Sequence, residues 1–216
     1  MSAIRRMMMG ARKSGYVTDG LVFRLDGIDK GTTDTSKWVD LVGGVVFTND
    51  GAVRGDTYWQ FDNNNTSYAL KNTDNLSYPS ETCTIEAVFD STKTSGLIFV
   101  PKESNMIALG CLNTLIIRNT QPPARTGWLV SVFTGKHAIS VNSSVGMQDF
   151  ATLQSGSANY WSSGNYNGIG ARSVNNAYSF NGKIYAIRIY NRLLTANEML
   201  QNQRYDNERF NLGLTI

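Results

Sequence analysis

Charged residues are scarce in this sequence, and long apolar runs are absent from it. Of its 216 residues 17% are charged, against about 25% in an average soluble domain, which argues against a charge-laced helical protein. No apolar run approaches the roughly 18 residues that span a membrane, so membrane insertion is excluded. With 41% hydrophobic and 11% aromatic residues the chain is too apolar to be disordered, and its length suits one β-rich domain.

Cysteine and histidine are also rare. The two cysteines, Cys83 and Cys111, form no CxxC pair, and each lies in or beside an apolar segment. We therefore expect two buried thiols rather than a disulfide, and the single histidine makes a zinc site implausible. That histidine, His137, alternates with Ile139 and Val141, which predicts a partly buried strand residue rather than a general base.

Several motifs of known chemistry are missing as well. The chain has no GxxxxGK(S/T) loop and no GxSxG elbow, so neither nucleotide-phosphate chemistry nor a hydrolase triad has support. The first fifteen residues are basic but contain no apolar stretch of about 7–15 residues, so they do not predict a secretory signal. We therefore expect the protein to leave a cell only by lysis, on a particle or by another non-classical route.

Positive charge is concentrated at the start of the chain. The net charge is +3, but residues 1–14 hold four bases and no acid, so the remaining 202 residues, with 16 bases and 17 acids, carry −1. Residues 15–90 hold 12 acids and 5 bases, and residues 91–216 hold 5 acids and 11 bases. The two parts should attract each other if the fold brings them together, and no global basic surface for nucleic acid is predicted.

Short alternating segments separated by turn residues dominate the rest of the chain. In Leu21–Leu25 and in Thr84–Phe89, apolar residues occupy every second position, as in half-buried strands. Further strand candidates are residues 96–100, 106–109, 115–118, 128–133, 137–141 and 183–190. Many short strands with frequent turn signals predict an antiparallel sandwich or barrel.

One helix is predicted near the end of the chain. Thr195-Ala196-Asn197-Glu198 is a capping box, in which the threonine hydroxyl accepts from the third helical amide and the glutamate reaches back to the cap. The helix should run to about Tyr205. Because so short a helix is marginal alone, it should be docked on the sandwich.

Distinct motifs occur at the start, in the middle and at the end of the body. They are Gly20-Leu21-Val22-Phe23-Arg24-Leu25-Asp26-Gly27, Trp38-Val39-Asp40-Leu41, Trp59-Gln60-Phe61-Asp62, Thr84-Ile85-Glu86-Ala87, Ile139-Ser140-Val141-Asn142, Ile169-Gly170-Ala171-Arg172, Phe180-Asn181-Gly182-Lys183-Ile184, and Arg188-Ile189-Tyr190-Asn191-Arg192-Leu193-Leu194-Thr195 with Glu198. Over residues 16–210 the chain resembles the LamG-like jelly rolls of the concanavalin A-like lectin/glucanase superfamily. The resemblance implies an all-β, antiparallel jelly-roll β-sandwich with one short C-terminal helix.

The resemblance carries further expectations. It implies a domain over residues 15–216 behind a flexible basic arm (residues 1–14), first and last strands in one sheet, and Trp38 and Trp59 in the core. Arg24, Glu86 and Arg188 would then share one solvent-side face, as a surface charge cluster that contributes little to stability. Asn181-Gly182 suits a tight hairpin before the last strand.

The superfamily includes glucanases, so catalysis has to be tested against the residues. Those enzymes place two carboxylates by a Glu-x-Asp-x-x-Glu spacing on one strand face, and the comparable segment here begins at Glu86. Val88 and Ser91 occupy the partner positions, and Asp90 is about 13 Å further along the strand. We therefore predict that the chain is not an enzyme. No cofactor is predicted either; Asp26, Asp29 and Asp34 form the densest acidic loop but lack EF-hand spacing, which leaves calcium open without support.

A polar segment rich in aromatics is the candidate carbohydrate-binding site. It offers aromatic faces for sugar C–H groups and amides for sugar hydroxyls. Its candidate residues are Asn159, Tyr160, Trp161, Asn165 and Tyr166. The alternative is that the aromatic residues attach this segment to the sandwich or to another subunit, and a homo-oligomer stays open.

The basic arm is the second candidate site. Its charges are Arg5, Arg6, Arg12 and Lys13, and Met7-Met8-Met9 adds flexible apolar side chains that adapt to irregular surfaces. It could order on a larger assembly, or it could be a disordered start. Jelly rolls with such a start and no signal peptide resemble decoration or appendage proteins of tailed bacteriophages. The resemblance implies a virion protein whose partners are other virion proteins and cell-surface glycans. A free bacterial carbohydrate-binding protein is the alternative, and a degenerate glycosidase is a third.

Overall fold

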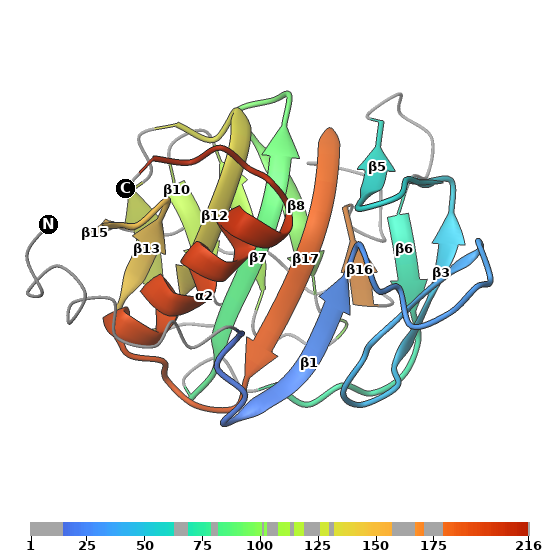
Figure 1. The fold of residues 1–216 in the computed structure, drawn as a ribbon, viewed down its shortest axis with the longest axis horizontal. Helices are drawn as coiled ribbons and strands as arrows, with labels where there is room; N and C mark the ends of the chain where they lie inside the picture. Colours follow the sequence, from blue (N-terminus) through green and yellow to red (C-terminus); the bar gives the residue numbers. More distant parts are fainter. Residues whose placement is uncertain are drawn as a thin grey trace, which may run out of the picture.

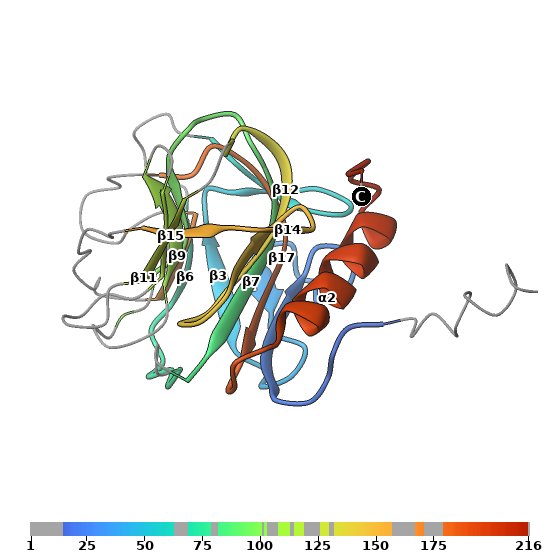
Figure 2. The ribbon, with the colours of Figure 1, turned by 90° about the vertical axis from the view of Figure 1, so that its left-hand side faces the viewer.

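The computed structural model describes residues 15–62, 69–78, 82–100, 102, 108–112, 115–118, 126–129, 132–156, 167–170 and 179–215. They form two antiparallel sheets packed face to face, with the helix α2 (Ala196–Arg209) on the outer side of one sheet (Figure 1, Figure 2). The predicted all-β antiparallel jelly-roll sandwich with a C-terminal helix is confirmed. The basic arm lies outside the described residues.

The sheet that carries the helix, here called sheet A, is built around the two longest strands, β7 and β17. Its order is β14-β13-β12-β7-β17-β5-β4, and β1 pairs with the second half of β17, as expected for first and last strands. The strands of sheet A are β1 (Leu21–Asp26), β4 (Val53–Arg54), β5 (Trp59–Phe61), β7 (Thr84–Ser91), β12 (Gly135–Val141), β13 (Gly146–Gln148), β14 (Ala151–Thr152) and β17 (Gly182–Tyr190).

The opposite sheet, here called sheet B, has the order β15-β11-β10-β9-β8-β16-β6-β3-β2. Its strands are β2 (Lys37–Val39), β3 (Val46–Asp50), β6 (Ala69–Asn72), β8 (Gly96–Val100), β9 (Leu109–Leu112), β10 (Leu115–Arg118), β11 (Thr126–Leu129), β15 (Gln154–Gly156) and β16 (Asn167–Ile169). Because β16 is antiparallel to both β6 and β8, these two strands end where β16 begins.

The core fills the space between the two sheets with apolar side chains from both inner faces. Trp38 and Trp59 are fully buried as expected, and their rings stack with centroids 6.0 Å apart. The indole N–H of Trp38 donates to the carbonyl of Asp26 at 3.1 Å. Cys83 and Cys111 are both buried in this core as thiols, which confirms the sequence prediction.

The predicted hairpin at Asn181-Gly182 is wrong. Ser179 and Phe180 still pair beside sheet B, with Leu97 and Gly170, whereas Gly182 begins β17 in sheet A. The glycine has φ +137°, and a Cβ there would lie 2.0 Å from the carbonyl oxygen of Asp90. The Asn-Gly pair therefore serves the crossing between the sheets, where only glycine allows the close approach to β7.

Most predicted strands occur with shifted ends. Of the expected strand at 106–109 only Leu109 lies in β9, and of the expected strand at 128–133 only Trp128 and Leu129 lie in β11; residues 106–107 and 130–131 lie outside the described part. The strands β2 to β6 and β13 to β16 were not predicted, because they are short and rich in polar or turn residues. Local composition does not identify such strands, because their pairing depends on partners far away in the chain.

The helix α2 begins as predicted and ends later. Thr195 is its N-cap, with the capping box in place: Glu198 N donates to the threonine hydroxyl, and Thr195 N donates to Glu198 Oε2 at 2.8 Å. It continues to Arg209 instead of about Tyr205 and is docked on sheet A. Within the described residues, no helix has the length and apolar character needed to cross a membrane.

Candidate functional site

The outer face of sheet A carries a buried charge cluster where the sequence analysis predicted a solvent-exposed one. Glu86 on β7 and Arg188 on β17 do point away from the core, but each is only 1% exposed because α2 lies over them. The helix presents Asn202, Gln203 and Asp206 to the sheet, and all three are buried. The expected surface charge cluster is therefore a buried one, since the inward face of this helix is polar.

Arg188 is the centre of the buried cluster. Its Nε donates to Glu86 Oε2 at 2.8 Å, and its two terminal nitrogens donate to the two oxygens of Asp206 at 2.9 and 2.5 Å. Asn202 donates to Glu86 Oε2 at 2.9 Å, and the hydroxyl of Ser140 donates to Oε1 at 2.8 Å. Each charge therefore has an opposite charge and further hydrogen bonds, which buried charges require.

The chain that follows the arm closes this cluster. The ring of Tyr16 lies over the Arg188 guanidinium, 4.0 Å from its centroid to Cζ, and the tyrosine hydroxyl donates to Asp206 Oδ1 at 2.8 Å. The backbone N–H of Val17 donates to Asn202 Oδ1 at 2.8 Å. Residues next to the arm are thus part of the same network as α2.

The cluster has no catalytic geometry. Burial raises the pKa of Glu86 most strongly, and the nearby charge of Asp206 adds to this while Arg188 opposes it. A raised carboxyl pKa is typical of a glycosidase acid, but Glu86 is closed off by α2 and Tyr16. A substrate cannot reach it, so Glu86 cannot serve as acid or nucleophile in this structure.

Asp26 lies beside this cluster and is also used structurally. It is fully buried, and its carboxylate accepts from Arg24 at 2.7 Å, from Arg209 at 3.0 Å, and from the backbone N–H groups of Ile28 and Asp29. Burial alone would raise the pKa of Asp26, but the hydrogen bonds from Arg209 and Arg24 outweigh it and lower that pKa. Arg24 therefore belongs to this second group and not to the predicted cluster.

In the acidic loop, Asp26 and Asp34 are engaged in ion pairs. Asp34 pairs with Lys37 at 2.9 Å, and the buried ammonium of Lys30 contacts the carbonyl oxygens of Gly27 and Asp56. Among the described residues, no three acidic, histidine or cysteine side chains come together as metal ligands. The protein's own cations neutralise this loop.

His137 is a buried strand residue, as predicted, with both ring nitrogens in use. Nδ1 lies 2.6 Å from Asp149 Oδ2, and Nε2 lies 3.0 Å from the carbonyl oxygen of Thr134. The residue as a whole is 8% exposed. Both of these partners are acceptors, which suits a protonated ring, while the side-chain amide nitrogen of Gln148 also lies 3.0 Å from Nδ1. Asp149 and Phe150 adopt φ +49° and +72°, and the N–H of Phe150 donates to Gln203 on α2 at 2.8 Å.

The predicted binding residues lie outside the described part of the chain. This holds for the carbohydrate candidates Asn159, Tyr160, Trp161, Asn165 and Tyr166, and for the arm residues Arg5, Arg6, Arg12 and Lys13. The residues that flank the aromatic segment are described: Gly156 ends β15 at the edge of sheet B, and Asn167 begins β16 within it.

Asn167 leads to a polar group that the sequence analysis did not single out. It is 1% exposed, and its Nδ2 donates to Asn72 Oδ1 at 3.1 Å and to the carbonyl of Asp74 at 2.9 Å. Its Oδ1 accepts from the N–H of Lys102 at 2.9 Å. The members of this polar group come from distant segments, so the sequence indicates it only through the run of Asn and Asp around residue 72.

Solved structures share this fold, whereas no protein-family model and no curated sequence matches the chain. Trypanosoma rangeli sialidase in complex with sialic acid matches at 15% identity and a TM-score of 0.56, over 88% of this chain and 33% of the sialidase. Domain 4 of AbnA, a GH43 extracellular arabinanase from Geobacillus stearothermophilus, in complex with arabinotriose, matches at 16% identity and a TM-score of 0.56, over 85% of this chain and 98% of that chain. The chain thus spans a third of the sialidase and nearly all of the arabinanase domain, and it shares the fold of these matched parts.

Replacing Arg188 by methionine should destabilise the protein by about 3–5 kcal/mol, because two buried carboxylates lose their counter-charge. Arg204→Met is the matched control: Arg204 is exposed on α2, the helix that covers Arg188, and its change should stay within about 0.5 kcal/mol. Urea unfolding followed by circular dichroism measures both. Equal losses for the two variants would contradict the role given to Arg188.

The contribution of His137 to stability should depend on pH. Burial alone would lower the pKa of His137, but Asp149, Thr134 and the charge of Asp90 together raise it above 6.5. Because the folded pKa is the higher one, the contribution is complete below pH 6.5 and is lost as pH rises through the folded pKa. The difference in unfolding free energy between the wild type and His137→Gln should shrink between pH 6 and pH 9. A difference that is constant or grows with pH would contradict the imidazolium assignment.

Proposed function

We propose that this chain is a non-catalytic, LamG-like carbohydrate-binding module, attached through its basic arm to a larger particle such as a phage virion. The sandwich would present a sugar-binding surface, and the arm would hold the module on its partner. This proposal names a binding function and an attachment, and each has its own support.

The likeness to domain 4 of the arabinanase carries the binding function. That domain, in complex with arabinotriose, corresponds to this chain over 98% of its length, so the match concerns the whole module rather than a fragment. The polar aromatic segment around Trp161 supplies the chemistry that such a module needs, with apolar faces for sugar rings and amides for hydroxyls. Sheet B carries both ends of that segment.

The state of the carboxylates supports a module without catalysis. Glu86, the one residue kept at the glucanase-like positions, is buried under α2, and Asp26 is bound by two arginines. A degenerate glycosidase is therefore the weaker alternative. The sialidase likeness does not favour it, because the chain covers only 33% of that enzyme.

The anchoring of residues 15–17 supports the attachment. Gln201 donates to the carbonyl of Gly15 at 3.2 Å, and Tyr16 and Val17 bind α2, so the chain after the arm is held on a rigid surface. These contacts fix the point on the α2 side of the sandwich at which the arm begins. A free bacterial carbohydrate-binding protein, which needs no attachment, is the alternative.

Glycan binding should depend on Trp161. On a glycan array that includes arabinotriose and sialic acid, the wild type should bind at least one glycan, and Trp161→Ala should lose about tenfold or more in affinity, because stacking on an aromatic ring is removed. Trp161→Tyr, which keeps a ring, is the control and should retain most of the binding. Silence of the wild type would overturn the binding function, and equal binding by Trp161→Ala would overturn the site.

Removing residues 1–14 should abolish attachment without affecting the sandwich. The truncated chain keeps Gly15, Tyr16 and Val17, so its unfolding free energy and its glycan binding should equal those of the full chain. Co-sedimentation with the candidate particle measures attachment. Unchanged sedimentation after truncation would contradict the arm's role and leave the free module as the better account.

A further inference from the structure

One end of sheet B carries a rigid polar group on the side away from α2. It lies where β6 and β8 end and β16 begins, and it contains Asn72, Asp74, Asn75 and Lys102 around the buried amide of Asn167. These residues come from three segments that are distant in sequence. Their side chains are held by one another and by the backbone.

Two buried amides form the base of this polar group. Asn72, 6% exposed, donates through Nδ2 to the carbonyl of Val46 and to Asp74 Oδ2, both at 2.9 Å, and accepts through Oδ1 from Asp74 N and from Asn167. Asn167 adds bonds to the backbone of Asp74 and Lys102. The positions of Asp74 and Lys102 are therefore determined by buried hydrogen bonds, which removes most of the ordering cost of binding.

Above this base, polar atoms remain open to a ligand. Asp74 and Asn75 are exposed, and Lys102 is half-buried. The Lys102 ammonium donates to the carbonyl of Thr73 at 3.1 Å and to Asn75 Oδ1 at 3.0 Å. Within the described part of the chain, Asp74 Oδ1 has no hydrogen-bond donor and Asn75 Nδ2 has no acceptor. These two atoms belong to consecutive residues and offer an acceptor and a donor, which are the two partners that a sugar hydroxyl needs because it donates and accepts at once.

We propose that Asp74, Asn75 and Lys102 form a binding site for a neutral, hydroxyl-rich sugar. The carboxylate and the ammonium cancel in charge, so the site does not favour a charged ligand. The inference rests on the proposed function, because it names residues through which the module would hold its sugar. Tyr166, the last of the aromatic candidates, directly precedes Asn167 in the chain.

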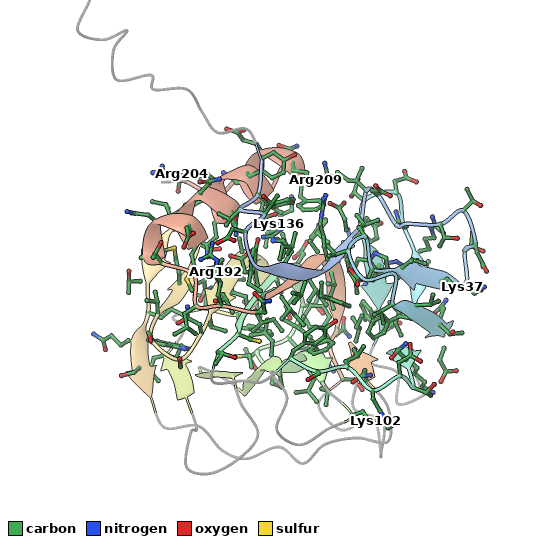
Figure 3. All side chains as sticks on the ribbon, turned by 90° about the horizontal axis from the view of Figure 1, so that it is seen from below. Lys37, Lys102, Lys136, Arg192, Arg204 and Arg209 are labelled. Atoms are coloured by element: carbon green, nitrogen blue, oxygen red, sulfur yellow. The ribbon has the colours of Figure 1, made fainter. Side chains whose placement is uncertain are left out.

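The position of the site agrees with a module that is attached on one side and binds on the other. Lys102 lies on the sheet B side of the sandwich, whereas Arg204 and Arg209 mark α2 on the opposite side (Figure 3), and Figure 2 shows the same separation of sheet B from the helix. Gly15, the first described residue, is held on α2 by the hydrogen bond from Gln201. Sugar at the site and a partner at the arm would not compete for space.

The test compares single variants of the full chain on the same glycan array. Asp74→Asn keeps the shape of the side chain, Lys102→Met keeps its length, and Asn75→Ala removes an exposed amide. Each should weaken binding of neutral glycans, such as arabinotriose, by roughly tenfold, because each removes a hydrogen bond between the sugar and a polar or charged side chain of the site. Melting temperatures of the variants check that the fold is kept, and Asn75→Ala, at an exposed position, decides the outcome if the other two unfold.

A matched pair of controls comes from the same sheet. Asp50 on β3 and Lys71 on β6 form an exposed ion pair of the same charges, outside the Asn167 network. Asp50→Asn and Lys71→Met should leave glycan binding unchanged. If the wild type binds neutral glycans and the three site variants bind equally well, this proposal fails and the proposed function stands. If the wild type binds no glycan, both this proposal and the proposed function fail. If it binds only carboxylated glycans, the proposal that the site takes a neutral sugar is overturned.

Discussion

The structure depends on the contact of Arg188 with two carboxylates that belong to different elements. Glu86 comes from the neighbouring strand and Asp206 from α2, so one guanidinium joins the sheet to the helix. Removing charges from water is costly, and the cost is offset here by the pairing and by the bonds from Ser140 and Asn202. Besides Met199, the residues that α2 buries against the sheet are polar, and Arg188 supplies the charged partner of one of them, Asp206.

This contact also determines what each side of the molecule can do. Sheet A is covered by α2 and by the residues that follow the arm, and Glu86, Asp206 and Asp26 are held there in structural ion pairs. Sheet B carries a polar group whose outer atoms are open, held from below by Asn72 and Asn167. The proposed division into an attachment side and a binding side rests on this unequal use of polar residues.

Local patterns were enough to predict the strands with clear alternation, the capping box at Thr195 and the buried tryptophans. The outward direction of Glu86 was correct as well, but its burial was not predicted, because α2 contacts the sheet mainly through the polar residues Asn202, Gln203 and Asp206, with Met199 as the apolar one. The Asn72–Asn167 bond joins residues 95 positions apart, and no local pattern reports such a pair. The hairpin predicted from the Asn-Gly pair at 181–182 was wrong for the same reason, since Gly182 is required by its close approach to a distant strand, β7.

Hydrogen–deuterium exchange of the full chain, with and without a neutral glycan that binds on the array, tests the central claim most directly. Amides slow to exchange should include those of β7, β17 and α2 in both states, because the buried charge cluster holds them. The glycan should slow exchange only near residues 69–75 and 102 and in the adjoining aromatic segment. Glycan protection confined to α2 and residues 15–18 would contradict the account.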